Sequence, residues 1–85
     1  MQYVYVLQSE QDDYLYIGCT NNLKNRLAEH NAGQNESTKS KKPFKIIYYE
    51  AFLDKNDAYA REKVLKQKWG RKFLERVLKR YFNKK

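Results

Sequence analysis

The stretch Gln2–Gly18, QYVYVLQSEQDDYLYIG, decides the fold of this 85-residue chain. Two runs rich in Tyr, Val, Leu and Ile, residues 2–7 and 14–18, flank the polar residues 9–13. Aromatic and β-branched residues favour strands, and a short polar interruption between two such runs favours a turn. The stretch therefore predicts a β-hairpin.

The register of this hairpin decides which side chains share a face, because a slip of one residue moves every side chain to the opposite face. Pairing Gln8 with Asp13 places Tyr5 opposite Tyr16 and collects the aliphatic side chains on the other face. We favour this register because it separates the tyrosines from the aliphatic residues. The alternative, one residue further along, places Tyr16 beside Val6, and the sequence leaves it open.

The rest of the chain predicts three helices and a third strand. In order, these are a helix at 23–31 capped by 20–22 and ended by Gly33, a lysine-bearing loop at 32–43, a strand at 44–52, a helix from Asp54 to Trp69 stopped by Gly70, and an amphipathic helix at 71–82. The strand at 44–52 carries large apolar residues on both faces, so we expect it to be covered on both sides and central in the sheet.

Size and composition limit the classes of protein that fit. Eighty-five residues leave room for one small domain, residues 1–85, and 41% hydrophobic residues exclude a disordered chain. No apolar run approaches the roughly 18 residues that cross a bilayer, and the N-terminus lacks the features of a signal peptide. We therefore expect a cytoplasmic protein without a membrane partner. Cys19 is the single cysteine, which excludes an intramolecular disulfide.

The positive charge is concentrated in the second part of the chain. The formal net charge is +8, yet residues 1–38 carry two basic and five acidic side chains, a sum of −3. This asymmetry favours a polyanionic partner such as nucleic acid, whereas the plainer interpretation is a solvated basic surface. The candidate contacts are Lys39, Lys41, Lys42, Lys79, Arg80, Lys84 and Lys85.

Glu62 interrupts an apolar stripe in the predicted second helix. Its neighbours at helical spacing are Ala58, Leu65 and Trp69. Burying an unpaired carboxylate is expensive, so Glu62 must be paired, protonated or bound to a cation. One interpretation is an ion pair with Lys66 one turn away. The other is a ligand for magnesium, which commonly takes only one or two protein carboxylates.

Four other side chains are candidates for chemistry. Arg26, at the border of the 23–31 helix's apolar stripe, can bind an anion through fixed, charged donors. His30 lies one turn further on the same edge and can relay a proton near neutral pH. Tyr5 and Tyr16 present hydroxyls on one sheet face, although strand tyrosines most often serve packing. Cys19 has only His30 as a base and no orienting group, so a catalytic thiol is not expected.

These residues together follow a known pattern. The order is Tyr3-Val4-Tyr5, ten residues, Tyr16-Ile17-Gly18, Arg26 within residues 23–27, and Glu62 within residues 60–66. Over nearly the whole chain this resembles the GIY-YIG nuclease superfamily, specifically its small standalone bacterial members. The resemblance implies an α+β fold with a small three-stranded antiparallel sheet flanked by about three helices.

The resemblance also implies a function and a role for each residue. It implies an endonuclease that cleaves phosphodiester bonds with one divalent metal, Mg²⁺ or Mn²⁺. Tyr5 and Tyr16 resemble the motif tyrosines, one of which positions or activates the attacking water; Arg26 resembles the phosphate-binding arginine, and Glu62 the metal ligand. His30 lies where family members place a histidine or tyrosine. Tyr3 replaces the motif's first glycine, and Cys19 stands where some branches have a lysine.

The expected substrate is DNA rather than RNA, with branched, flapped or single-stranded forms as candidates. A larger repair complex or a homodimer is a candidate assembly, since two copies are needed to cut both strands at once. The alternative is a non-catalytic nucleic-acid-binding protein, or an accessory factor of a repair complex, that keeps the fold without turnover.

Overall fold

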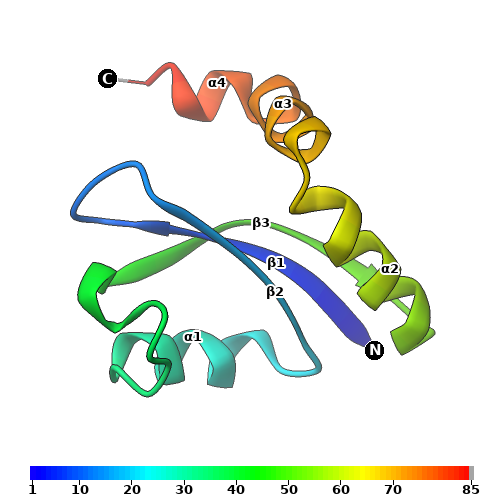
Figure 1. Ribbon diagram of the computed structural model, residues 1–85, viewed down its shortest axis with the longest axis horizontal. Coiled ribbons are helices and arrows are strands. Elements are labelled where there is room, and N and C mark those ends of the chain that lie inside the picture. The colour runs from blue at the N-terminus through cyan, green and yellow to red at the C-terminus, as the bar shows by residue number, and fades with distance from the viewer. Residues whose placement is uncertain (85) are drawn as a thin grey trace.

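A computed structural model describes residues 1–84. Its elements are β1 (Gln2–Ser9), β2 (Leu15–Thr20), α1 (Leu23–Asn31), the 3₁₀ turn η1 (Lys39–Lys41), β3 (Phe44–Phe52), α2 (Lys55–Leu65), α3 (Lys68–Val77) and α4 (Lys79–Phe82). The strands form one antiparallel sheet in the order β2-β1-β3, with α1 on one side and α2 to α4 on the other (Figure 1). The predicted α+β class is confirmed. None of the helices within residues 1–84 has the length and apolarity needed to cross a membrane.

β1 is the central strand, so the central position predicted for residues 44–52 is wrong. The four residues from Val4 to Leu7 are each at most 1% exposed, because β1 is paired on both sides and covered on both faces. β3 lies at an edge, yet both of its faces are covered: Phe44 packs in the cluster under α1, and Phe52 packs against Val4 and Ala58 under α2. The apolar residues on both faces of β3 are therefore explained by the helices that cover each face and not by a central position in the sheet.

The hairpin has neither of the two predicted registers. Tyr5 is paired with Gly18, two residues beyond its favoured partner Tyr16. The loop is longer than predicted, and the Ser9 N–H donates to the Tyr14 carbonyl at 3.0 Å. A shift of two keeps the side-chain alternation, so Tyr5 and Tyr16 still share a face. A Cβ at position 18 would lie 2.6 Å from the Tyr5 hydroxyl oxygen, so the ring of Tyr5 occupies space that only a glycine leaves free.

α1 agrees with its predicted bounds. The Asn22 side chain caps the helix by accepting a hydrogen bond from the Asn25 N–H at 3.0 Å. Leu23 and Leu27, the predicted apolar stripe, pack against the cluster that contains Tyr5. This contact fixes α1 on the tyrosine face of the sheet.

The break between the second and third helices lies at Lys66 and Gln67, not at Gly70 as predicted. Gly70 is within α3, where a Cβ would meet the Leu65 carbonyl oxygen at 2.0 Å. The glycine is required because the start of α3 packs directly on the last turn of α2. The predicted helix at 71–82 is also divided, since α3 ends before Leu78 and α4 begins after it.

We expect Gly70→Ala to destabilise the protein by about 3 kcal/mol, as a forced overlap with backbone cannot be relieved by a rotamer change. The measurement is the urea midpoint of unfolding. Lys72→Ala, an exposed position on the same helix, is the control and should change stability by less than about 0.5 kcal/mol. Equal midpoints for the two variants would contradict the close packing of α2 and α3.

Candidate active site at the edge of β2

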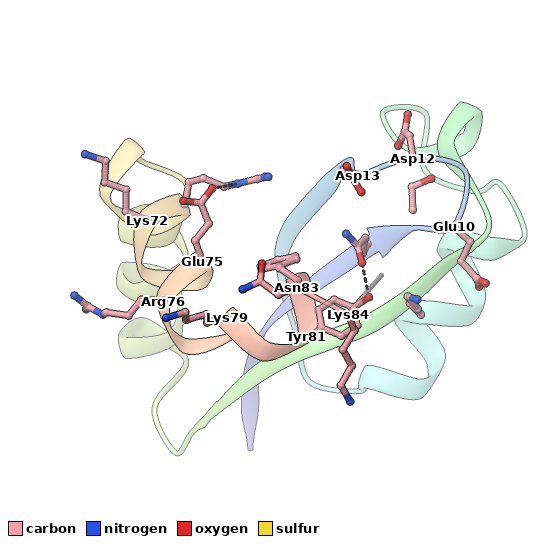
Figure 2. A pocket seen from close by; sticks show the side chains of 15 residues that line it. Glu10, Asp12, Asp13, Lys72, Glu75, Arg76, Lys79, Tyr81, Asn83 and Lys84 are labelled. Atoms are coloured by element: carbon pink, nitrogen blue, oxygen red, sulfur yellow. Dashed lines mark hydrogen bonds and ion pairs between the residues drawn. The ribbon is translucent and has the colours of Figure 1, made fainter.

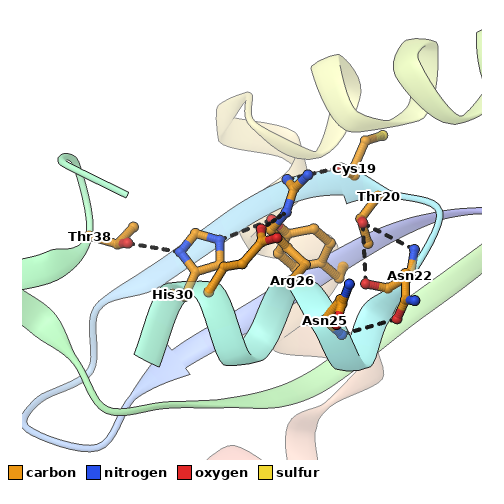
Figure 3. Close-up of polar contacts among 9 residues, drawn as sticks. Cys19, Thr20, Asn22, Asn25, Arg26, His30 and Thr38 are labelled. Carbon is orange, nitrogen blue, oxygen red and sulfur yellow. Dashed lines mark hydrogen bonds and ion pairs between the residues drawn. The ribbon is translucent and has the colours of Figure 1, made fainter. Parts of the chain in front are cut away.

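The free edge of β2 brings together predicted residues from both faces of the sheet. Arg26 of α1 reaches it from one side and donates from Nη1 to the Cys19 carbonyl at 3.4 Å (Figure 3). Glu62 of α2 reaches it from the other side, and its carboxylate helps to raise the pKa of the Cys19 thiol. The guanidinium and the carboxylate therefore flank the same β2 residue, on the strand that also carries Tyr16.

Tyr5 is part of this site but is closed off from solvent. Its side chain is 1% exposed, and its hydroxyl lies 3.1 Å from His30 Nε2. Burial raises the pKa of Tyr5 to about 12, although a hydrogen bond from Arg26 acts in the opposite direction. The phenol therefore stays neutral near pH 7. Its ring lies 6.3 Å from that of Tyr16, centroid to centroid, so the two predicted tyrosines are neighbours.

His30 is fully buried, which corrects its predicted place on the edge of the helix. The loop after α1 folds over it, and its Nδ1 lies 2.8 Å from the Thr38 hydroxyl. Desolvation, together with the nearby Arg26, lowers the pKa of His30, so the imidazole is neutral at pH 7. Thr38 was missed by sequence reasoning because a threonine in a polar loop gives no sign that it will be buried beneath that loop.

Arg26 keeps part of its side chain open to solvent. Its Nε pairs with Glu29 Oε1 at 3.0 Å, and the two side chains are 40% and 47% exposed. The hydrogen bond to Tyr5 raises the pKa of Arg26. The Arg26 guanidinium is held by its contacts with Glu29 and the Cys19 carbonyl and is partly exposed, so it can bind an anion with little loss of side-chain entropy.

Glu62 forms the predicted ion pair with Lys66, whose Nζ lies 2.9 Å from Glu62 Oε2. This contact raises the pKa of Lys66. Within residues 1–84, no group of three His, Cys, Asp or Glu side chains could hold a metal ion. Nucleases of the matched family generally depend on a divalent metal, and a hard cation can be held by one carboxylate with water and phosphate completing its shell. Glu62 fits that role as a single carboxylate, 21% exposed.

Cys19 has an inert thiol. Burial raises its pKa to about 11, and the hydrogen bond with Glu62 acts in the same direction. The thiol therefore stays protonated at neutral pH, and a protonated thiol is a poor nucleophile.

The loop lysines predicted to contact nucleic acid lie next to the hairpin. Lys41 pairs with Asp12 at 2.7 Å and Lys39 with Glu36 at 3.2 Å. The Ser9 hydroxyl donates to the Lys41 carbonyl at 2.6 Å, which ties the loop to the end of β1. Lys42 is exposed.

The predicted basic residues at the C-terminus lie near a cleft of about 910 Å³ between the hairpin and helices α3 and α4. Lys79 and Lys84 line it, and carboxylates of the hairpin stand across from them (Figure 2). The Tyr81 hydroxyl donates to the Gln8 side chain and joins α4 to the sheet. Arg80 is exposed on α4, and Lys85 lies outside the described residues. Arg71 lines both this cleft and a smaller hollow beside Tyr16, so the cleft continues toward the edge of β2.

Comparison with known proteins identifies the fold. The three-stranded sheet with helices on both faces is a nuclease-type fold, since the family model described as "GIY-YIG catalytic domain" matches residues 1–84. The chain belongs to the GIY-YIG family.

Its relatives are small bacterial proteins named UPF0213. One from Clostridium perfringens is 41% identical over 68 residues, which cover 79% of this chain and 72% of that protein. One from Pediococcus pentosaceus is 43% identical over 67 residues, 78% and 70% of the two chains. One from Oceanobacillus iheyensis is 39% identical over 66 residues, 76% of each. No solved structure matches the chain significantly.

We expect alkylation of Cys19 by iodoacetamide to follow a pKa near 11 rather than the ordinary thiol value of about 8.5. Glu62→Gln should lower that pKa, because it removes the anionic acceptor of the thiol proton, and should speed alkylation at pH 9. Glu75→Gln, on exposed α3, is the control and should leave the profile unchanged. The readout is the mass of the intact protein against time across a pH series. An ordinary thiol profile in the unmodified sequence would contradict the contact between Cys19 and Glu62.

Proposed function

We propose that this protein is a divalent-metal-dependent endonuclease that hydrolyses phosphodiester bonds in DNA. The observation that carries the proposal is the meeting of Arg26 and Glu62 at Cys19 on the open edge of β2. A phosphate at this edge would have a fixed cation on one side and a carboxylate on the other, beside the hydroxyl of Tyr16. Membership in a family with a nuclease-type fold supports the same conclusion.

The residues divide the chemistry between binding and activation. The open part of the Arg26 guanidinium would bind the scissile phosphate and stabilise the charge that develops on its oxygens. Glu62 would hold the divalent metal, which supplies charge stabilisation at the phosphate and leaving group when bound. Lys66 would release Glu62 when that cation arrives, because one carboxylate cannot serve both partners equally.

Tyr16 is the better candidate for the tyrosine that orients or activates the attacking water. Its side chain is partly exposed and lines a hollow together with Lys66. Tyr5 is closed off by His30 and Gly18, and burial raises its pKa to about 12. We assign Tyr5, with His30, to holding Arg26 in place.

A second candidate function is a nucleic-acid-binding protein or accessory factor without turnover. The observation that favours it is the ion pair between Glu62 and Lys66, which occupies the carboxylate needed for a metal. In both candidate functions the protein would bind nucleic acid in the bacterial cytoplasm and take part in DNA repair. It would act alone, as a homodimer or within a larger complex.

We expect Mg²⁺- or Mn²⁺-dependent cleavage that Glu62→Gln and Arg26→Ala each reduce by about 10²- to 10³-fold, the usual effect of removing one group that stabilises transition-state charge. Glu62→Gln should retain binding and fold. The assay uses labelled single-stranded, duplex, flapped and branched DNA, and RNA, with each metal or EDTA. Glu36→Gln, an exposed loop position, controls for loss of a carboxylate.

Products that survive in both variants would come from a contaminant. Binding that persists in EDTA, with no product on any substrate, would move the conclusion to the non-catalytic candidate. Cleavage of RNA alone would overturn the choice of DNA.

The proposed path of the nucleic acid runs from the β2 edge past Arg71 toward α4, with Lys39, Lys41 and Lys42 as further contacts. Replacing the four basic residues of the C-terminus with Gln should flatten the slope of log K against log salt by up to about 3.6, since each phosphate contact contributes about 0.9. These four are Lys79, Arg80, Lys84 and Lys85.

Fluorescence anisotropy with a labelled oligonucleotide from 50 to about 200 mM salt measures this slope. A variant with the same loss of charge elsewhere separates contact from net charge: Lys24, Lys55, Lys63 and Lys68 changed to Gln. Equal slopes in the two variants would contradict the path along α4.

A further inference from the structure

A chain of side-chain contacts runs from the loop after α1 to the arginine of the candidate site. Thr38 and His30 are each 0% exposed, and Tyr5 is 1% exposed. Thr38 Oγ1 lies 2.8 Å from His30 Nδ1 (Figure 3), and His30 Nε2 lies 3.1 Å from the Tyr5 hydroxyl. The Tyr5 phenol in turn raises the pKa of the neighbouring Arg26. Because Thr38, His30 and Tyr5 are shielded from water, each of their polar hydrogens needs an acceptor within the protein.

The arginine end of the chain fixes the proton of Tyr5. A guanidinium has donors only, so toward the neighbouring Arg26 the Tyr5 oxygen can serve only as an acceptor. The buried Tyr5 O–H then needs an acceptor, and His30 Nε2 lies within hydrogen-bond distance of it, at 3.1 Å. Since the imidazole is neutral, an Nε2 that accepts requires the proton on Nδ1.

The contacts of Thr38, at the loop end of this series of contacts, also place the His30 proton on Nδ1. The Thr38 hydroxyl lies 3.5 Å from the Asn35 carbonyl oxygen, which can only accept. Its one proton is directed there, so its oxygen accepts from His30 Nδ1. The three hydrogen bonds then point the same way, from the Tyr5 hydroxyl to the Asn35 carbonyl, an arrangement in which each bond strengthens the next.

We propose that Thr38 is a positioning residue of the site: it fixes the Nδ1–H tautomer of His30, so that Tyr5 donates to His30 and turns its oxygen lone pairs toward Arg26. Thr38 contacts neither Arg26 nor the β2 edge and acts only through His30 and Tyr5. Its effect on catalysis rests on the proposed function, whereas its effect on the His30 tautomer does not.

His30 is the only histidine of the chain, so ¹⁵N NMR of its imidazole reads the tautomer without ambiguity. We expect a protonated Nδ1 and an unprotonated Nε2 in the unchanged protein. Thr38→Val removes the acceptor while keeping the shape of the side chain, and should shift the proton toward Nε2. Thr38→Ser retains the hydroxyl and should restore the original signals. Thr20→Val, another buried threonine, is the matched control and should leave the tautomer unchanged.

The activity arm compares kcat and KM of the same variants on whichever substrate is cleaved. Thr38→Val should lower kcat/KM about ten-fold, the effect of one weakened hydrogen bond, and Thr38→Ser should return it. A protonated Nε2 in the unchanged protein overturns the proposal, as does an unchanged tautomer in Thr38→Val. If Thr38→Val does not fold, the unchanged protein and Thr38→Ser still decide the tautomer. If no substrate is cleaved, the proposed function fails while the NMR result still stands.

Discussion

The packing of the Tyr5 ring over Gly18 is the constraint on which the rest of the structure depends. It places a large polar side chain in the middle of the central strand, with its hydroxyl under α1 and away from water. A buried hydroxyl must find a partner, and both its hydrogen-bond partner His30 and the neighbouring Arg26 are on α1. The hydroxyl therefore fixes how α1 lies on the sheet, and through Arg26 it also fixes where the cation stands at the edge of β2.

The position of the site follows from β2 being an edge strand. A central strand has its carbonyls paired on both sides, whereas an edge strand leaves one row free. One such carbonyl, that of Cys19, accepts from Arg26, and the thiol of the same residue contacts Glu62 on the other face. Only at a free edge can α1 and α2, which lie on opposite faces, bring opposite charges to one residue. The exposure that makes an edge a liability in other proteins here leaves the candidate site open to solvent.

The sequence is sufficient for the local features and insufficient for those that depend on contacts across the fold. The cap at Asn22, the third strand and the shared face of Tyr5 and Tyr16 follow from short-range patterns, and the structure has all three. The hairpin register depends on the length of a polar loop that carries no periodic signal. Gly70 is ambiguous for a similar reason: a glycine that ends a helix and one that admits a neighbouring helix look alike until that neighbour, Leu65, is placed.

Glu62 shows how the two candidate functions arise from one arrangement. Its carboxylate forms an ion pair with Lys66. Its negative charge also helps to raise the pKa values of Cys19 and Tyr5. Under either candidate function, Arg26 at this edge would bind phosphate whether or not the protein cleaves it. In the proposed nuclease, the Glu62 carboxylate would matter for cleavage alone, because it would attract a divalent cation to a place where the surrounding positive charge repels one. Lys66 already occupies the Glu62 carboxylate and would compete with a metal ion for it. Its long side chain is partly exposed and can move away. If the proposed function holds, the balance between binding and cleavage would be a competition of two cations for one carboxylate. Substrate phosphates would favour the divalent cation, because they would contribute further oxygen ligands to it.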